Sequence, residues 1–472
     1  MVFSSAVFLF AFLPICLAGY YLLQKREAKN VFLLIMSLAF YAWGEPKYIL
    51  LLLFSILLNY ICALLIDKNR DSLRKMKLFL VCGLIADLGI LFVFKYLGFF
   101  MTNVRTFTGA DIAVPDIALP IGISFFTFQA ISYLADVYTN KAKLQKSLYK
   151  LALYISFFPQ LIAGPIVRYN SIEEQMDSRK EDAGLFSGGV RRFIIGLAKK
   201  SILANLLAVF TDSIFEYGYH ERTVLLAWFG VLGYCLQLYY DFSGYSDMAI
   251  GLGRMFGFKF EENFDYPYIS RSASEFWRRW HISLGRWFKD YVYIPLGGSK
   301  KGMTRHIMNL FVVWLLTGIW HGASWNFVLF GLYYFIIIAA EHFIRGVVPE
   351  TVAGNKGIIF LQHIYALIVV YFGWLLFRVS GLQTLSRYLK DMFGFSGNSL
   401  YDSYSYSLVL QYLPVVIIGV VFATPVLKVL QNRMTGLSIM KPAADIAGVL
   451  LFIVSLSFVV SSAYNPFIYF NF

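Results

Sequence analysis

The sequence predicts an all-α protein that crosses a membrane about eleven times and also carries re-entrant and interfacial helices. Of its 472 residues, 58% are hydrophobic and only 15% are charged, which is more apolar than a soluble domain of this length requires. Several uninterrupted apolar runs approach the ~20 residues that a helix needs to cross a bilayer. Basic loops alternate with these runs, so the net charge of +13 indicates cytoplasmic loops and not nucleic acid binding.

The N-terminal part of the chain contains a series of apolar runs joined by loops of alternating charge. We expect spans at 5–23, 31–43, 48–66, 78–97 and 119–137. The loops at 24–30, 67–77 and 138–150 are basic, whereas the loop that holds Asp111 and Asp116 is acidic. Because basic loops tend to stay in the cytoplasm, the N-terminus is predicted to lie outside. No positive charge precedes the first run, which favours a retained anchor over a cleaved signal peptide.

The pattern is interrupted in the middle of the chain. Residues 157–169 are apolar but broken by Pro159, Gly164 and Pro165, which predicts a re-entrant or broken segment on a cavity wall. Residues 190–215 are predicted to form an interfacial helix that leads into the membrane.

Residues 223–256 begin as a span and then become polar, so we expect a bend or an unwound turn at Ser243-Gly244. Two carboxylates, Asp241 and Asp247, fall in this polar part. They can cap helix ends or pair with arginines, or they can line a reaction chamber.

The segment 276–291 carries four cations and three tryptophans. At ~2.5–3.5 kcal/mol for each cation, placing all four at the bilayer centre would cost on the order of 10–14 kcal/mol. We therefore expect one interfacial helix that dips into a funnel, with His281 beside its apolar face. That face would consist of Trp277, Trp280, Leu284 and either Phe288 or Trp287.

The C-terminal part resumes the alternation. Residues 307–321 enter the membrane with His321 at the far end, and apolar runs follow at 327–340, 358–376, 406–426 and 446–461. The basic stretch 428–441 is predicted to be cytoplasmic, so both termini would be extracytoplasmic. With no internal repeat, we expect a single domain over 1–472, which argues against a transporter built from inverted repeats.

The chemistry available to this chain points to histidine. The sequence lacks G-x-S-x-G, H-E-x-x-H, C-x-x-C and a P-loop, so neither a serine nucleophile nor a metal or a bound cofactor is expected. A buried neutral imidazole can take the proton of a hydroxyl that attacks a thioester. His281 and His321 lie 40 positions apart, and Asn326, the indole of Trp325 or His281 itself could hold the developing oxyanion.

Several long segments make the chain similar to a known family. They are LGYCLQLYYDFSGYSDMAIGLGRMFGFKFEENFDYPYIS (232–270), EFWRRWHISLGRWFKDYVYIPLGGSK (275–300), GIWHGASWNFVLFG (318–331) and NPFIYFNF (465–472). With 119–138 and 157–169, they resemble the membrane-bound O-acyltransferase (MBOAT) family, closest to the bacterial branch that includes alginate O-acetyltransferase. The core motifs occupy 119–331. The resemblance implies that His321 is the catalytic histidine and that His281 is the second family histidine. Residues expected to line the funnel are Trp280, Trp320, Asn326, Trp325, Asp241 and Ser243.

The resemblance also implies a ring of helices around a thin partition with a funnel from each face. An acyl group would arrive from the cytoplasm on acetyl-CoA or another thioester, and an acceptor hydroxyl from outside. An extracytoplasmic acetyltransferase or polysaccharide export machinery would be the partner, and the cell membrane the location. Two alternatives stay open: D-alanyl transfer from a carrier protein to teichoic acid, and, in another class, a transporter or flippase.

Overall fold

The computed structural model describes residues 1–219, 221–345, 355–434, 440–461 and 467–468. Over these ranges the chain is helical and contains no strand. It divides into two compact units: unit 1 comprises 1–194 and 245–261, and unit 2 comprises 195–244 and 262–472. The prediction of one domain is not tested by this division. Of the tail motif 465–472, only Phe467 and Ile468 lie within the described residues.

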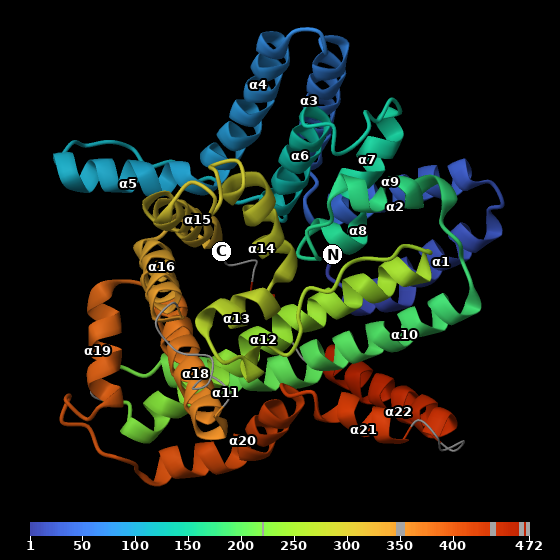
Figure 1. Cartoon of the computed structure of the whole chain (residues 1–472). Helices are drawn as coiled ribbons and strands as arrows, with labels where there is room; N and C mark the ends of the chain where they lie inside the picture. Colours follow the sequence, from blue (N-terminus) through green and yellow to red (C-terminus); the bar gives the residue numbers. More distant parts are fainter. Residues whose placement is uncertain (220, 346–354, 435–439, 462–466, 469–472) are drawn as a thin grey trace. The chain divides into compact units, whose positions relative to one another are not determined.

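Unit 1 consists of the N-terminal helices. In Figure 1, α3 and α4 lie side by side, and α5 turns away from α4 at a steep angle after the π-helical turn η2. The helices of this unit are η1 (Phe8–Phe12), α1 (Leu13–Leu22), α2 (Arg26–Gly44), α3 (Ile49–Lys68), α4 (Leu73–Leu91), η2 (Phe92–Tyr96), α5 (Leu97–Thr108), α6 (Ile123–Tyr138), α7 (Leu148–Ser156), α8 (Phe158–Leu161) and α9 (Tyr169–Ser178).

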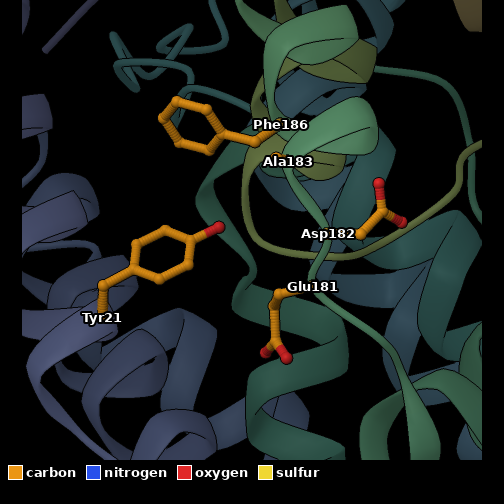
Figure 2. Close-up of a pocket in the computed structure, with 5 residues that line it drawn as sticks. All are labelled: Tyr21, Glu181, Asp182, Ala183 and Phe186. Atoms are coloured by element: carbon orange, nitrogen blue, oxygen red, sulfur yellow. The ribbon is translucent and has the colours of Figure 1, made fainter.

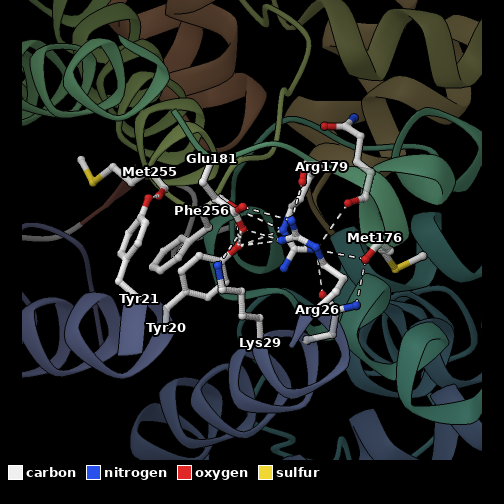
Figure 3. A network of polar contacts seen from close by, with 11 residues as sticks. Tyr20, Tyr21, Arg26, Lys29, Met176, Arg179, Glu181, Met255 and Phe256 are labelled. Atoms are coloured by element: carbon white, nitrogen blue, oxygen red, sulfur yellow. Dashed lines mark hydrogen bonds and ion pairs between the residues drawn. The ribbon is translucent and has the colours of Figure 1, made fainter. Parts of the chain in front are cut away.

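A cluster of charged side chains fastens α1 and α2 to the segment that follows α9 (Figure 3). Glu181 pairs with Arg26 and, at 3.3 Å, with Lys29. Arg179 donates to Oδ1 of Asn30 at 2.7 Å and to the hydroxyl of Tyr20 at 3.0 Å. Burial by itself would raise the pKa of Glu181, but hydrogen bonds from Arg26 and Tyr20 and the charge of Arg26 lower it to about 2. Glu181 therefore stays ionised among its cations at neutral pH.

The broken segment predicted over 157–169 is confirmed as broken. Phe157 separates α7 from α8, and a turn followed by extended chain leads to α9. The residues from 157 to 167 are all buried. Gln160 donates to the carbonyl of Tyr154 at 2.5 Å, and Tyr154 donates to the carbonyl of Val167 at 2.9 Å. Side chains of the protein thus satisfy part of the backbone that the prolines leave without helical partners.

Unit 2 contains the C-terminal helices and the turn regions between them. In this unit α15 and α16 follow each other in the chain and pack against each other. The helices of this unit are η3 (Lys199–Ala204), α11 (Asn205–Phe215), η4 (Pro267–Ile269), α13 (Ala273–Arg279), α14 (Ile282–Phe288), η5 (Lys289–Tyr293), α15 (Met303–His321), α16 (Trp325–Arg345), α18 (Lys356–Arg378), α19 (Leu382–Met392), α20 (Ser403–Phe422), α21 (Val426–Met434) and α22 (Met440–Ser461).

The boundary between the units falls within α10 (Ala183–Ala198) and α12 (Val224–Met255), and α12 corrects one prediction. It is a single helix of 32 residues, so the expected break at Ser243-Gly244 is wrong. A Cβ on Gly244 would lie 2.8 Å from the carbonyl oxygen of Gly196. The glycine therefore serves close packing against a neighbouring helical segment and does not interrupt its own helix.

Eight helices within the described ranges are long and apolar enough to cross a membrane. They are Ile49–Lys68, Leu73–Thr108, Ala183–Phe215, Val224–Met255, Trp325–Ile344, Lys356–Arg378, Ser403–Phe422 and Pro442–Ser461. The run Ala183–Phe215, made of α10, η3 and α11, includes the residues 190–215 that were expected to be interfacial, and it is long and apolar enough to span. Length and composition do not distinguish the two arrangements, so the interfacial helix stays a prediction. Other expected spans, such as 5–23 and 119–137, are shorter helices. The total of about eleven stays a prediction.

Candidate active site

His281 lies at a break between two short helices of unit 2. It separates α13 from α14 and adopts the left-handed conformation, with φ +46° and ψ +53°, which costs about 1–2 kcal/mol for a residue other than glycine. The single helix predicted over 276–291 is therefore wrong. Of its expected apolar residues, Trp280, Leu284 and Phe288 are buried and Trp277 is partly buried, but they are divided between two helices and the break that joins them and do not lie on one helical face.

Asn263 holds this break together. Its backbone carbonyl accepts the N–H of Ile282 at 3.0 Å. Its side-chain Oδ1 accepts the backbone N–H of Ser283 at 3.2 Å and the Ser283 hydroxyl at 2.9 Å. The same Oδ1 lies 3.1 Å from Nδ1 of His281. Nothing in the sequence singles out Asn263, because it lies in a loop and belongs to no recognisable spacing.

The imidazole of His281 is enclosed by aromatic rings. The residue is 1% exposed, its ring meets that of Phe242 edge-on at 4.6 Å, and the Trp320 ring lies at 5.8 Å between centroids. Burial, and secondarily the neighbouring His321, hold the pKa of His281 well below its usual range. His281 is therefore neutral near pH 7.

His321 is the last residue of α15, at the turn into α16. It is 2% exposed, and its ring packs on Trp320 at 5.0 Å, on Phe377 at 5.1 Å and on Phe330 at 5.6 Å between centroids. The Trp320 ring thus contacts both imidazoles. The structure brings together the two histidines that the sequence singled out; their catalytic roles stay predictions.

Close packing at the tip of the α15–α16 hairpin fixes the position of His321. A Cβ on Gly318 would lie 2.3 Å from the carbonyl oxygen of Phe327, and a Cβ on Gly331 would lie 2.4 Å from the carbonyl oxygen of Trp314. Two helix backbones can approach this closely only where both carry small residues.

The other predicted lining residues fall in different environments. Trp280 and Trp320 are buried, and Asn326 is buried with Nδ2 donating to the carbonyl of Phe377 at 3.2 Å. Trp325 is 52% exposed. Ser243 is buried within α12.

The carboxylates Asp241 and Asp247 both have cationic partners. Asp241 pairs with Lys200 at 2.5 Å and accepts the backbone N–H of Ile468 at 2.8 Å, all within unit 2. Asp247 pairs with Arg192 at 2.7 Å within unit 1. The expected pairing with an arginine is thus found for Asp247, and Asp241 pairs with a lysine instead. That these carboxylates line a reaction chamber stays a prediction.

A pocket of about 370 Å³ lies in unit 1 and contains none of the predicted site residues. Figure 2 shows the rings of Tyr21 and Phe186 and the carboxylates of Glu181 and Asp182 around it. Asp182 caps α10 by accepting the N–H of Leu185 at 2.7 Å. Both carboxylates thus already have partners in the helix scaffold.

Comparison with known proteins identifies the class. The model of the MBOAT, membrane-bound O-acyltransferase family matches residues 89–382, a range that includes His281 and His321. The chain therefore belongs to this family of membrane acyltransferases and is an enzyme.

Individual relatives cover between about half of the chain and its full length. It is 38% identical to the probable alginate O-acetylase AlgI of Pseudomonas putida over the full length of both proteins. It is 36% identical to the peptidoglycan O-acetyltransferase of Helicobacter pylori, over 85% of this chain and 81% of that protein. It is 30% identical to the teichoic acid D-alanyltransferase of Bacillus subtilis, over 47% of this chain and 59% of that protein.

Proposed function

We propose that this enzyme transfers an acetyl group from a cytoplasmic thioester, such as acetyl-CoA, to a hydroxyl of an extracytoplasmic polysaccharide or to a partner transferase. The observation that carries the proposal is the pair of buried imidazoles on one tryptophan ring, inside the segment that matches an acyltransferase family. The relatives that cover most of the chain are named for O-acetyl transfer to alginate and to peptidoglycan.

His321 acts in this proposal as the general base. Its imidazole takes the proton of the acceptor hydroxyl while the hydroxyl oxygen bonds to the acyl carbon. The C–S bond of the thioester then breaks, and the proton passes from the imidazole to the leaving thiolate. No serine nucleophile and no metal is required for this sequence of steps, and His281, whose ring contacts the same Trp320 ring, assists.

The test is the O-acetyl content of the surface polysaccharide in cells that make the wild type or His321→Ala. General base catalysis contributes about 10²–10⁴-fold to a rate, so the variant should leave the polymer almost unacetylated. His363→Ala provides a matched control, since His363 is a histidine of α18 whose Nδ1 lies 3.2 Å from the carbonyl of Ser270. Equal O-acetyl content with His321→Ala, at equal amounts of membrane protein, would exclude the role.

D-alanine is the alternative acyl group, since a D-alanyltransferase is similar to nearly half of the chain. Acetyl transfer is favoured because the O-acetyl-transferring relatives cover much more of it. Purified enzyme given labelled acetyl thioester should release the free thiol and an acetylated acceptor. Release of D-alanine from cell walls by mild base, only in cells that hold the enzyme, would instead identify D-alanyl transfer.

A further inference from the structure

We propose that Asn263 is a positioning residue that fixes the tautomer of His281, so that Nε2 carries the lone pair and this ring accepts protons. That this lone pair accepts a proton during acetyl transfer rests on the proposed function. The tautomer itself follows from hydrogen bonds around Asn263 and can be measured without any assay of activity.

The first step is the orientation of the Asn263 amide. The two ends of an asparagine amide look alike in shape, so their assignment must come from the hydrogen-bond network. The backbone N–H of Ser283 can only donate, and it points to the Asn263 atom that also faces His281. That atom must therefore be the oxygen, since an NH₂ group there would meet another donor.

The second step is the proton on the ring. An amide oxygen only accepts, so Nδ1 of His281, at 3.1 Å from it, must carry the hydrogen. In a neutral imidazole the other nitrogen is then bare. Nε2 of His281 is buried and has no hydrogen-bond partner among the residues that the structure describes. The ring therefore presents an acceptor atom inside unit 2.

The third step is the backbone at the same residue. Asn263 accepts from Ile282 with its main chain and from Ser283 with its side chain, so it closes the turn in which His281 is left-handed. Asn263 thus fixes both the orientation of the His281 ring and the ring nitrogen that carries the hydrogen. This explains why the strained conformation persists at a position where glycine is absent.

The assignment changes one expected role. His281 is one of the residues expected to donate to a developing oxyanion, but in this tautomer the neutral ring has no hydrogen on Nε2. The second N–H of Asn326 stays available for that task, since one already binds the carbonyl of Phe377. His281 instead acts as a proton acceptor beside His321.

The groups that face His281 determine how it titrates. Phe242 approaches from α12, Trp320 and His321 from α15, and Asn263 and Ser283 from the turn. Of these, His321 is the titratable one, and no carboxylate is among them. A carboxylate introduced at Asn263 would therefore act on His281 directly.

The direct test is nitrogen NMR of ¹⁵N-histidine-labelled enzyme, with the His281 signals assigned by their loss in His281→Gln. We expect protonated Nδ1 and bare Nε2 at neutral pH in the wild type. Asn263→Ala should lose this single tautomer. Ser283→Ala, the matched control, removes one hydrogen bond to the same oxygen and should keep it. A hydrogen on Nε2 in the wild type, or an unchanged tautomer in Asn263→Ala, would overturn the proposal.

Asn263→Asp gives a second measurement if the alanine variant does not fold. It keeps an acceptor oxygen of the same shape but adds a charge that stabilises the imidazolium. The acidic limb of acetyl transfer against pH should then move upward by about 1–3 pH units, with activity regained at high pH. An unshifted limb would count against the proposal. A third outcome separates the two parts of the proposal. If the wild type shows the expected tautomer but His281→Gln transfers acetyl normally, His281 has no role in proton transfer, whereas Asn263 still fixes the tautomer of its ring.

Discussion

Lys200 and Asp241 form an ion pair within unit 2 whose side chains are only 5% and 2% exposed. Two charges in such a place are tolerated because each neutralises the other, and Asp241 also accepts the N–H of Ile468. The ion pair therefore adds little to the free energy of unfolding, but removal of one partner leaves a buried charge without compensation.

We predict that Lys200→Met destabilises the enzyme by about 3–5 kcal/mol, because a buried carboxylate loses its cation. The double variant Lys200→Met with Asp241→Leu should recover most of the loss. Retention of folded protein after heating in detergent, followed by size-exclusion chromatography, measures both. A double variant no more stable than the single one would contradict this account.

Single residues were predictable where chemistry restricts the choice. His281 and His321 stand out because few residue types can act as a base near neutral pH, and the structure places both on Trp320. Asn263 acts through hydrogen bonds to residues 18 to 20 positions away, and no sequence motif indicates such contacts. The exposure of Trp325 was equally unpredictable, because it depends on where α16 begins relative to its neighbours.

The α15–α16 hairpin depends on two glycines at the level of helix packing. Gly318→Ala should push the helices apart near His321, since the new methyl group would lie against the carbonyl oxygen of Phe327. We expect acetyl transfer to fall more than the yield of folded protein. Gly448→Ala is the matched control, because a Cβ there meets nothing within 4 Å. Equal losses in the two variants would refute this dependence.

Helices were predictable from apolar runs, whereas their interruptions were not. The sequence predicts a break at Gly244 within 223–256, yet this glycine lies inside α12 where another backbone approaches. The reverse error occurred at His281, where a helix was expected to continue. A glycine marks either a turn or a close approach, and only the packed neighbour distinguishes the two.

The orientation of the whole chain gives a further prediction. If basic loops lie in the cytoplasm, Asp116→Cys should react with a membrane-impermeant thiol reagent in intact cells, whereas Ser299→Cys should react only after permeabilisation. Both residues are exposed, and Cys82 is the native cysteine to remove first because it is also exposed. The opposite pattern would invert the predicted topology.

At the scale of the molecule, composition was enough to predict a helical membrane protein, and long shared segments were enough to predict its family. The division into two compact units was not predictable, because no linker or change in composition marks it. The number of membrane spans was not predictable either. The length of a short apolar helix such as Phe8–Leu22 does not determine whether it crosses the membrane.

The contact of Ile468 with Asp241 joins residues 227 positions apart. During synthesis, Lys200 and Asp241 emerge long before the segment that completes their surroundings. Unit 2 must therefore wait, partly assembled in the bilayer, until residue 468 has been synthesised. A ribosome that stalls before that residue would release a chain whose buried ion pair is still incompletely enclosed.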